Sequence, residues 1–169
     1  MDVAAWIGRM RQAALERNYS GTFVVLSAHG AMASYRIWHA CDGQRQIERV
    51  EALSGTPRIV FRRDGEVRTF LPQERVVRSE MRQAPGSFPG VPAASGAQPA
   101  RHYMVRMGRP ERVAGLDADM LDFVPRDAWR FGYRVWIDRA SGLLMKMQII
   151  DGDGDRKSTR LNSSHLGIS

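Results

Sequence analysis

The sequence predicts an α+β fold in which one amphipathic helix is followed by a large antiparallel sheet. Near the amino terminus, apolar residues recur at spacings of three and four, which is typical of a helix with one buried face. Farther along, apolar and polar residues alternate in short stretches that are separated by Gly-containing turns. The chain has 169 residues, 43% of them hydrophobic, which fits about one domain with a packed core.

The amino-terminal stretch is expected to form the helix. Asp2 can cap its first turn, and the helix should end near Arg17. NYSG, residues 18–21, is expected to turn the chain into a strand over 22–26, TFVVL. One face of the helix carries the apolar residues Trp6, Ile7, Met10, Ala13 and Ala14.

The next two stretches are expected to be strands. Residues 34–40, SYRIWHA, alternate in polarity, so Tyr35 and Ile37 should share one face while Arg36 lies on the other. Residues 45–53, RQIERVEAL, fit the period of a strand or of a helix, and the neighbouring strands favour a strand.

A hairpin is predicted in the middle of the chain. Residues 57–63 and 66–72 are strand-like, and Asp64-Gly65 between them is typical of a tight type I′ turn, whose central residues have positive φ. A further short strand is expected over 75–81. Residues 83–100 are rich in Pro and Gly, which predicts a long loop.

The last part of the chain restarts the sheet. We expect strands over 102–108 and 117–124, with a turn at Ala114-Gly115 before the second of them. In the strand over 130–138, Tyr133 and Val135 should share a face. In the strand over 143–151, one face is expected to carry Leu143, Met145, Met147 and Ile149. Together these strands predict a single antiparallel sheet, covered by the helix on one face and partly solvated on the other.

The sequence lacks the common signatures of catalysis and metal binding. No pair of histidines has the i, i+4 spacing of a helical zinc site, and Cys41 has no second cysteine to join it. Neither a G-x-S-x-G elbow nor a phosphate-binding Gly-rich motif occurs. We therefore expect a protein that is not an enzyme, with no catalytic residue, no metal and no cofactor.

The formal net charge of +7 comes mostly from arginine, whose planar guanidinium suits phosphates and carboxylates. A nucleic acid, an anionic lipid headgroup and an acidic protein would all fit such a charge, as would a basic surface with no such partner. Aromatic residues among the arginines in YRIWH and WRFGYRVW resemble base-stacking surfaces, but they fit core positions of a sheet more simply.

The carboxy-terminal stretch breaks the alternating pattern. Asp155–His165 matches the translation of a sequencing-library adapter along its whole length. We therefore expect residues 1–154 to be the natural domain, residues 155–169 to be a non-native tail, and a following domain to be missing.

Several stretches together resemble the amino-terminal domain of the MucB/RseB family, whose members are periplasmic regulators of the envelope-stress sigma factor. The resemblance runs from about Ala5 to Asp151, and its most specific part is the closing stretch. The stretches are WIGRMRQAALERNYSGTFVV, YRIWHACDG, ERVEALSGTPRIVFRRDGEV, RVAG and FGYRVWIDRASGLLMKMQIID.

The resemblance implies a fold like that of the lipoprotein carriers LolA and LolB, with a large curved antiparallel sheet, an incomplete barrel, wrapped around a few helices. It implies a periplasmic protein that binds the periplasmic domain of a membrane-spanning anti-sigma factor. It also implies release by lipopolysaccharide or by an acylated lipoprotein held in an apolar cavity. A homodimer is a further expectation, whereas a nucleic-acid partner is not expected.

The candidate site residues follow from that implied cavity. Apolar strand residues could hold an acyl chain, although the same residues could instead pack against the helix. Arginines at the rim could meet phosphates of a lipid headgroup. The expected cavity residues are Tyr35, Ile37, Phe61, Met120, Tyr133, Val135, Met145 and Met147, and the expected headgroup residues are Arg36, Arg62 and Arg68.

Two alternatives stay open at this point. One is a lipoprotein or lipid carrier of the same fold with no signalling partner. The other is a basic nucleic-acid-binding module, which predicts a steep salt dependence of binding, whereas cavity binding of an acyl chain should depend far less on salt.

Overall fold

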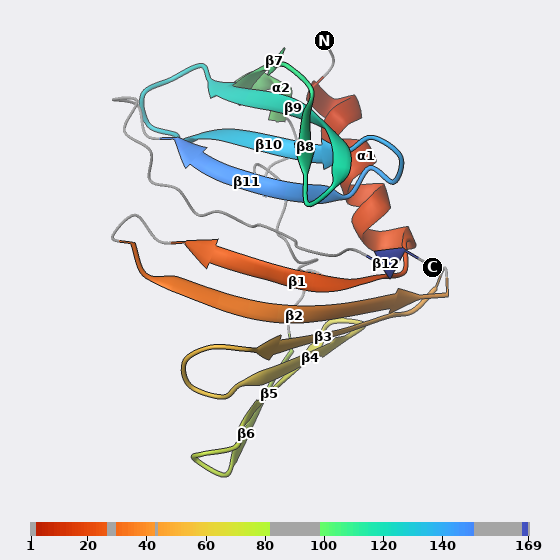
Figure 1. The fold of residues 1–169 in the computed structure, drawn as a ribbon, viewed down its shortest axis with the longest axis vertical. Coiled ribbons are helices and arrows are strands. Elements are labelled where there is room, and N and C mark those ends of the chain that lie inside the picture. Colours follow the sequence, from red (N-terminus) through yellow and green to blue (C-terminus); the bar gives the residue numbers. More distant parts are fainter. Residues whose placement is uncertain (1–2, 27–29, 43, 82–98, 151–166, 169) are drawn as a thin grey trace.

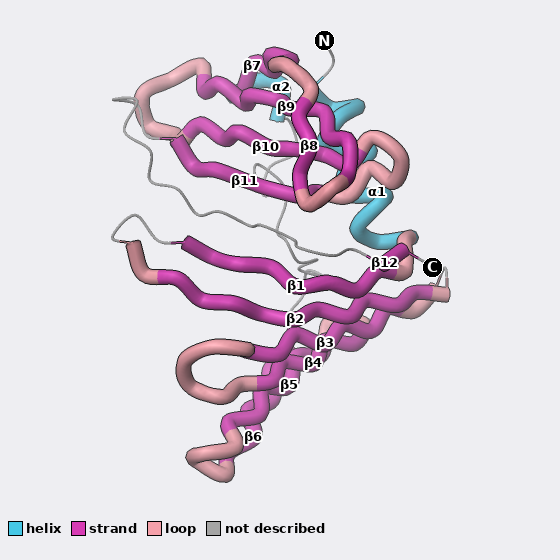
Figure 2. Tube along the Cα trace, in the orientation of Figure 1, coloured by secondary structure: helices cyan, strands magenta, loops and turns pink. Residues whose placement is uncertain are grey.

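The computed structural model describes residues 3–26, 30–42, 44–81, 99–150 and 167–168. Most of this part of the chain forms antiparallel strands (Figure 2). Two sheets lie one above the other, and one long helix runs beside both (Figure 1). The predicted cap Asp2 and most of the predicted loop over 83–100 lie outside the described residues.

The first sheet, here called the large sheet, has seven strands in the order β12-β1-β2-β3-β4-β5-β6. Apart from β12, the strands follow one another along the chain as antiparallel hairpins. They are β1 (Tyr19–Leu26), β2 (Met32–Cys41), β3 (Gln46–Ala52), β4 (Ile59–Arg63), β5 (Glu66–Leu71), β6 (Val76–Met81) and β12 (Gly167–Ile168).

The second sheet, here called the small sheet, has five strands in the order β11-β10-β9-β7, with β8 also paired to β9. Its strands are β7 (Tyr103–Met107), β8 (Glu111–Val113), β9 (Leu116–Pro125), β10 (Gly132–Asp138) and β11 (Leu144–Ile150). The helices are α1 (Val3–Glu16) and the short α2 (Pro99–His102).

The prediction of a single sheet is therefore wrong, although the antiparallel pairing and the one long helix are confirmed. Strongly twisted sheets of more than about ten strands tend to split into packed sheets, which explains the division. The two sheets are not joined edge to edge by any strand pairing among the described residues, so the barrel is not closed. Gly167 and Ile168, in the stretch expected to be a non-native tail, pair with Tyr19 and Ser20.

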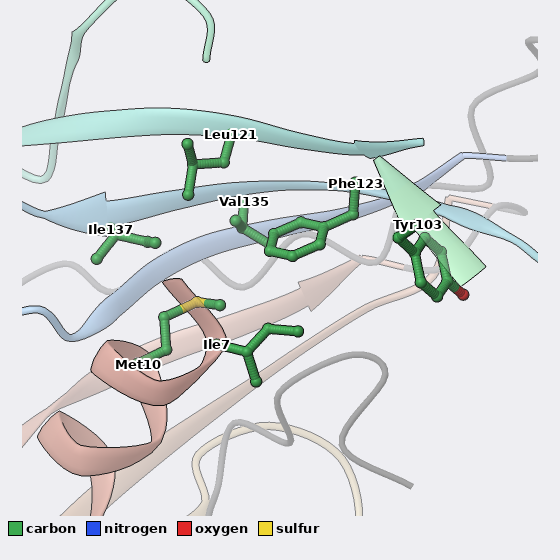
Figure 3. Close-up of a cluster of buried hydrophobic side chains, with 7 residues drawn as sticks. All are labelled: Ile7, Met10, Tyr103, Leu121, Phe123, Val135 and Ile137. Carbon is green, nitrogen blue, oxygen red and sulfur yellow. The ribbon is translucent and has the colours of Figure 1, made fainter. Parts of the chain in front are cut away.

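The helix α1 holds the two sheets together. Ile7 and Met10, in its first half, are buried against the small sheet in one core cluster (Figure 3). Ala13, in its second half, belongs to a different cluster with residues of the large sheet. The apolar stripe predicted from the sequence thus packs against both sheets. Among the described residues, no helix is both long and apolar enough to span a membrane.

Both predicted tight turns are confirmed by the backbone. Asp64 and Gly65 have φ values of 47° and 102°, and Ala114 and Gly115 have values of 52° and 84°. Two consecutive positive φ values are what a type I′ hairpin requires. The predicted turn over 18–21 is wrong, because β1 already begins at Tyr19 and its first residues pair with β2.

A β-bulge in the small sheet changes one face assignment. Trp136 pairs with Lys146, whereas Ile137 pairs with Leu144, so β11 has one extra residue at this point. The extra residue moves Met145 to the face opposite Met147, because a bulge breaks the alternation of side chains. The predicted common face for Met145 and Met147 is therefore wrong.

We expect Gly142→Ala to destabilise the fold by about 2 kcal/mol, from left-handed backbone strain and a close approach to α1. Gly142 has φ +80°, and an added Cβ would lie 3.3 Å from Ala13 Cβ and 3.4 Å from Arg9 Cγ. Gly115→Ala is the matched control. At φ +84°, its Cβ would meet nothing within 4 Å, so it should cost about 1 kcal/mol from strain alone. Urea unfolding measures both, and equal losses would contradict the predicted close approach.

Candidate functional site

The face of the large sheet that carries Tyr35 and Ile37, here called the inner face, has a buried polar row. Tyr19 and His39 stack with their ring centroids 4.7 Å apart, and His39 Nδ1 lies 2.9 Å from the carbonyl oxygen of Arg17. Next in the row, Arg62 Nη1 donates a 2.7 Å hydrogen bond to Glu48 Oε1. The register explains the row, because β1, β2, β3 and β4 place these residues opposite one another.

Burial, followed by the charge of the nearby Glu48 carboxylate, raises the pKa of the Tyr19 phenol well above its usual value. The folded protein therefore keeps the Tyr19 proton at pH values at which the unfolded chain, with a phenol pKa of about 10, has lost it. The stabilisation that this proton gives the folded state is complete below about pH 10, and it is lost as the pH rises above 10.

We therefore expect Tyr19→Phe to flatten the alkaline loss of stability. Wild-type protein should lose free energy of unfolding as the pH rises above about 10, and the variant should lose less, because phenylalanine has no proton to release. Urea unfolding at a series of pH values measures both slopes. Equal slopes would mean that Tyr19 ionises with the same pKa in the folded and unfolded states.

Two of the predicted cavity residues lie on the inner face of the large sheet. Ile37 is buried in the cluster that includes Ala13 of α1, and Tyr35 packs against the same cluster. The Tyr35 ring stacks on Phe23, with centroids 5.0 Å apart. The predicted alternation of 34–40 is confirmed, since Arg36 and Trp38 lie on the other face.

Three more predicted cavity residues belong to the small sheet and face α1. Val135 is fully buried in the cluster with Ile7 and Met10, and Tyr133 packs against this cluster. Met147 packs against both this cluster and the cluster of the large sheet. Its side chain therefore lies where the cores of the two sheets meet.

The remaining three predicted cavity residues lie elsewhere. Met145 and Met120 belong to a third cluster on the far side of the small sheet, with Trp136 and Val113 of β8. Phe61 is opposite Arg49 in the register and so lies on the outer face of the large sheet, away from Ile37. These three residues do not share a surface with the five that face α1.

The predicted headgroup arginines do not gather at one rim. Arg62 is on the inner face, paired with Glu48. Arg36 and Arg68 are on the outer face, and Arg68 Nε lies 2.6 Å from Glu66 Oε1. The structure thus separates one of the three from the other two.

On the outer face of the large sheet, Arg49 packs with two aromatic rings, and this group of side chains was not predicted from the sequence. Arg49 lies between two rings, with its Cζ 4.7 Å from the centroid of Trp38 and 5.8 Å from that of Phe61. A hollow of about 450 Å³ opens beside these side chains and is also lined by Ile47 and Ser20. Trp38, Arg49 and Phe61 lie opposite one another on β2, β3 and β4, so they form one row across the strands. Predicting this row from the sequence would have required the register of the three strands.

No group of acidic, histidine or cysteine side chains suited to a metal occurs in the part of the chain that the structure describes. The candidate site consists of apolar and aromatic side chains together with ion-paired arginines.

Comparison with known proteins identifies a family that the chain matches along most of its length. The MucB/RseB N-terminal domain matches residues 2–157. The sigma factor AlgU regulatory protein MucB of Pseudomonas aeruginosa is 28% identical over 154 residues, which cover 90% of this chain and 47% of that protein. The chain thus spans about half the length of the curated relatives that it matches.

Solved structures agree with the sequence match. MucB in the Pseudomonas aeruginosa MucA/MucB complex superposes with a TM-score of 0.80 and 26% identity, over 100% of this chain and 58% of that one. A more distant likeness, with a TM-score of 0.39 and 11% identity, is to a LolA superfamily protein from Nitrosomonas europaea, over 92% of this chain and 74% of that one. The relatives bear the names of regulatory proteins, in keeping with a protein that is not an enzyme. The chain belongs to the MucB/RseB N-terminal domain family.

Proposed function

We propose that this chain is part of a negative regulator of an envelope-stress sigma factor, and that it acts in the periplasm. On this proposal, it binds the periplasmic domain of a membrane-spanning anti-sigma factor. The observation that carries the proposal is the match along the whole chain to MucB as found in its complex with MucA. The family match over residues 2–157 is in agreement with it.

We further propose that lipopolysaccharide or an acylated lipoprotein weakens this binding. The apolar side chains that face α1 come from both sheets, and Met147 packs against both clusters. An acyl chain gains about 0.8 kcal/mol for each CH₂ that it buries, so it could compete with α1 for these side chains. Such competition would change how the two sheets pack against α1 and so how they are placed relative to each other. Lipid binding would in this way alter the affinity for the anti-sigma factor.

The first test is direct binding. The chain is titrated into a fluorescently labelled periplasmic fragment of MucA, and the bound complex is then titrated with lipopolysaccharide and, separately, with an acylated lipopeptide. We expect saturable binding of MucA and its loss on addition of either lipid. A folded chain that does not bind MucA would contradict the anti-sigma proposal, and a complex that neither lipid weakens would contradict only the lipid proposal.

The second test locates the lipid site. Displacement of a fluorescent fatty acid is compared for the wild-type chain, Met147→Gln and Met107→Gln. Met147→Gln should weaken probe binding, whereas Met107 is 51% exposed and its replacement should have no effect. Equal effects of the two variants would place the acyl chain away from the core of the two sheets.

The same measurements address the alternatives. A lipid carrier would bind the fatty acid but not MucA. A nucleic-acid-binding module would bind a DNA duplex with an affinity that falls steeply as salt is added, whereas probe binding in an apolar site should persist at high salt.

A further inference from the structure

The loop between β9 and β10, residues 126–131, carries the most exposed large apolar side chain of the described residues. Trp129 is 93% exposed, and Phe131, two residues later, is 47% exposed. Figure 1 shows this loop projecting beyond the ends of the two strands that it joins. An exposed tryptophan is typical of a contact surface, because its ring combines a large apolar area with one polar N–H group.

Hydrogen bonds fix both ends of the loop to the chain that leads into β7. The backbone N–H of Arg126 donates a 2.8 Å hydrogen bond to the carbonyl oxygen of His102. The carbonyl oxygen of Phe131 accepts a 3.2 Å hydrogen bond from the Tyr103 hydroxyl. The loop is thus held in one place, and little conformational freedom is left to lose when it binds.

The loop and its surroundings are basic. Inside the loop, Asp127 accepts a 3.1 Å hydrogen bond from the Trp129 backbone N–H and forms an ion pair with Arg130. Arg126 and Arg101 are exposed, and neither has an ion-pair partner among the described residues. Arg101 lies beside the loop, because the next residue of α2 supplies the carbonyl oxygen that anchors it. Two uncompensated positive charges therefore flank the exposed ring.

This combination fits the surface of a bilayer that contains anionic lipids. Tryptophan is enriched at the boundary between headgroups and acyl chains, and each basic side chain near the surface adds attraction to anionic headgroups. A protein partner would need about 800 Å² of complementary surface around such a ring. A protruding loop suits a bilayer better, because only a few side chains have to enter it.

We propose that the chain docks on an anionic bilayer surface through the loop 126–131. Trp129 and Phe131 enter the headgroup layer, while Arg126 and Arg101 meet lipid phosphates. Both aromatic residues lie outside the core clusters of the described residues, so this site contacts the membrane surface and not an acyl chain held between the sheets. The inference does not rest on the proposed function, because it needs neither MucA nor a lipid in the core.

Sedimentation with lipid vesicles is the first test. The whole chain is mixed with vesicles of phosphatidylcholine alone, or of an equal mixture with phosphatidylglycerol. We expect wild type to bind the anionic vesicles more tightly than the neutral ones, and Trp129→Ala to bind them about tenfold more weakly. Because the ring is exposed, its removal leaves the fold intact. A folded wild-type chain that binds neither vesicle would overturn the proposal and assign the loop to a protein contact.

Met81→Ala is the matched control for the loss of an exposed apolar side chain. Met81 is 80% exposed on β6, at the end of the molecule that is farthest from the small sheet (Figure 1). This variant should bind the anionic vesicles like wild type. Equal binding by Trp129→Ala and Met81→Ala would overturn the role of the loop.

The charges supply the second test. Arg126→Gln should weaken binding to the anionic vesicles about fivefold. Arg78→Gln removes the same charge from a side chain that is 66% exposed on β6, far from the loop, and should have little effect. Equal losses for the two variants would mean that the net charge of the chain attracts it to the membrane, which would overturn docking by the loop.

Fluorescence quenching supplies the third test. Vesicles with brominated acyl chains should quench the emission of Trp129, because its ring enters the bilayer, whereas Trp6, Trp38 and Trp136 are buried or half-buried. Quenching should therefore be largely lost in Trp129→Phe, and equal quenching in this variant would overturn the orientation. Trp129→Ala should still bind MucA and the fluorescent fatty acid, so failure of the docking proposal leaves the proposed function unaffected.

Discussion

Replacing Phe123 with alanine is expected to lower the free energy of unfolding by about 3–5 kcal/mol. Phe123 is 2% exposed and lies in the cluster in which Ile7 and Met10 of α1 meet the small sheet (Figure 3). Removing the ring leaves a cavity between helix and sheet that the surrounding side chains can fill only in part. Urea unfolding followed by circular dichroism measures the change.

Phe131→Ala is the control for this prediction. It removes the same atoms, but Phe131 is 47% exposed and lies outside the core clusters among the described residues. Its carbonyl oxygen, which accepts a 3.2 Å hydrogen bond from the Tyr103 hydroxyl, is retained. The control should therefore cost less than about 1 kcal/mol. Similar losses for the two variants would mean that the helix does not pack on the sheet at Phe123.

Replacing Arg62 with methionine is expected to cost about 3 kcal/mol. The side chain of Glu48 is only 5% exposed and accepts a 2.7 Å hydrogen bond from Arg62. Methionine keeps the length of the arginine stem but removes the charge, so the buried carboxylate loses the counter-charge that Arg62 supplies. The measured quantity is the free energy of unfolding at neutral pH.

Arg68→Met separates burial from ion pairing. The Arg68–Glu66 pair is equally short, at 2.6 Å, but its side chains are 55% and 33% exposed. Water solvates Glu66 when its partner is removed, so this variant should cost less than about 1 kcal/mol. If the two variants were equally destabilised, the burial of Glu48 would not be the cause.

Residue alternation predicted much of the fold because it depends only on local geometry. The faces of the strands that contain Tyr35 and Tyr133 follow from a period of two, and the turns at Asp64-Gly65 and Ala114-Gly115 follow from residues that accept positive φ. The strand over 45–53 and the long amino-terminal helix are confirmed as well.

The wrong predictions for Phe61, for Met145 and for the number of sheets arise from strand pairing between distant parts of the chain. Alternation of polarity shows which residues of one strand share a face. It does not show which face of a distant strand lies on the same side of the sheet, because that depends on the pairing register. Phe61 and Ile37 lie on opposite faces because of the register through β3, and Met145 leaves the face of Met147 because of a bulge. The division into two sheets depends on all the strands together, so no single stretch of sequence encodes it.

The position of α1 has a consequence for how the chain folds. The helix comes first in the sequence, but the strands that bury Ile7 and Met10 begin only at Tyr103, and Arg9 donates a hydrogen bond to the carbonyl oxygen of Arg139. As the chain emerges from a ribosome or a translocation channel, Ala13 can soon pack against β1 and β2, whereas Ile7 and Met10 lack their partners until most of the domain has been made. Contacts so distant in sequence slow folding and prolong the exposure of apolar surface. We therefore expect Ile7 and Met10 to stay exposed to solvent until residues beyond 137 have emerged.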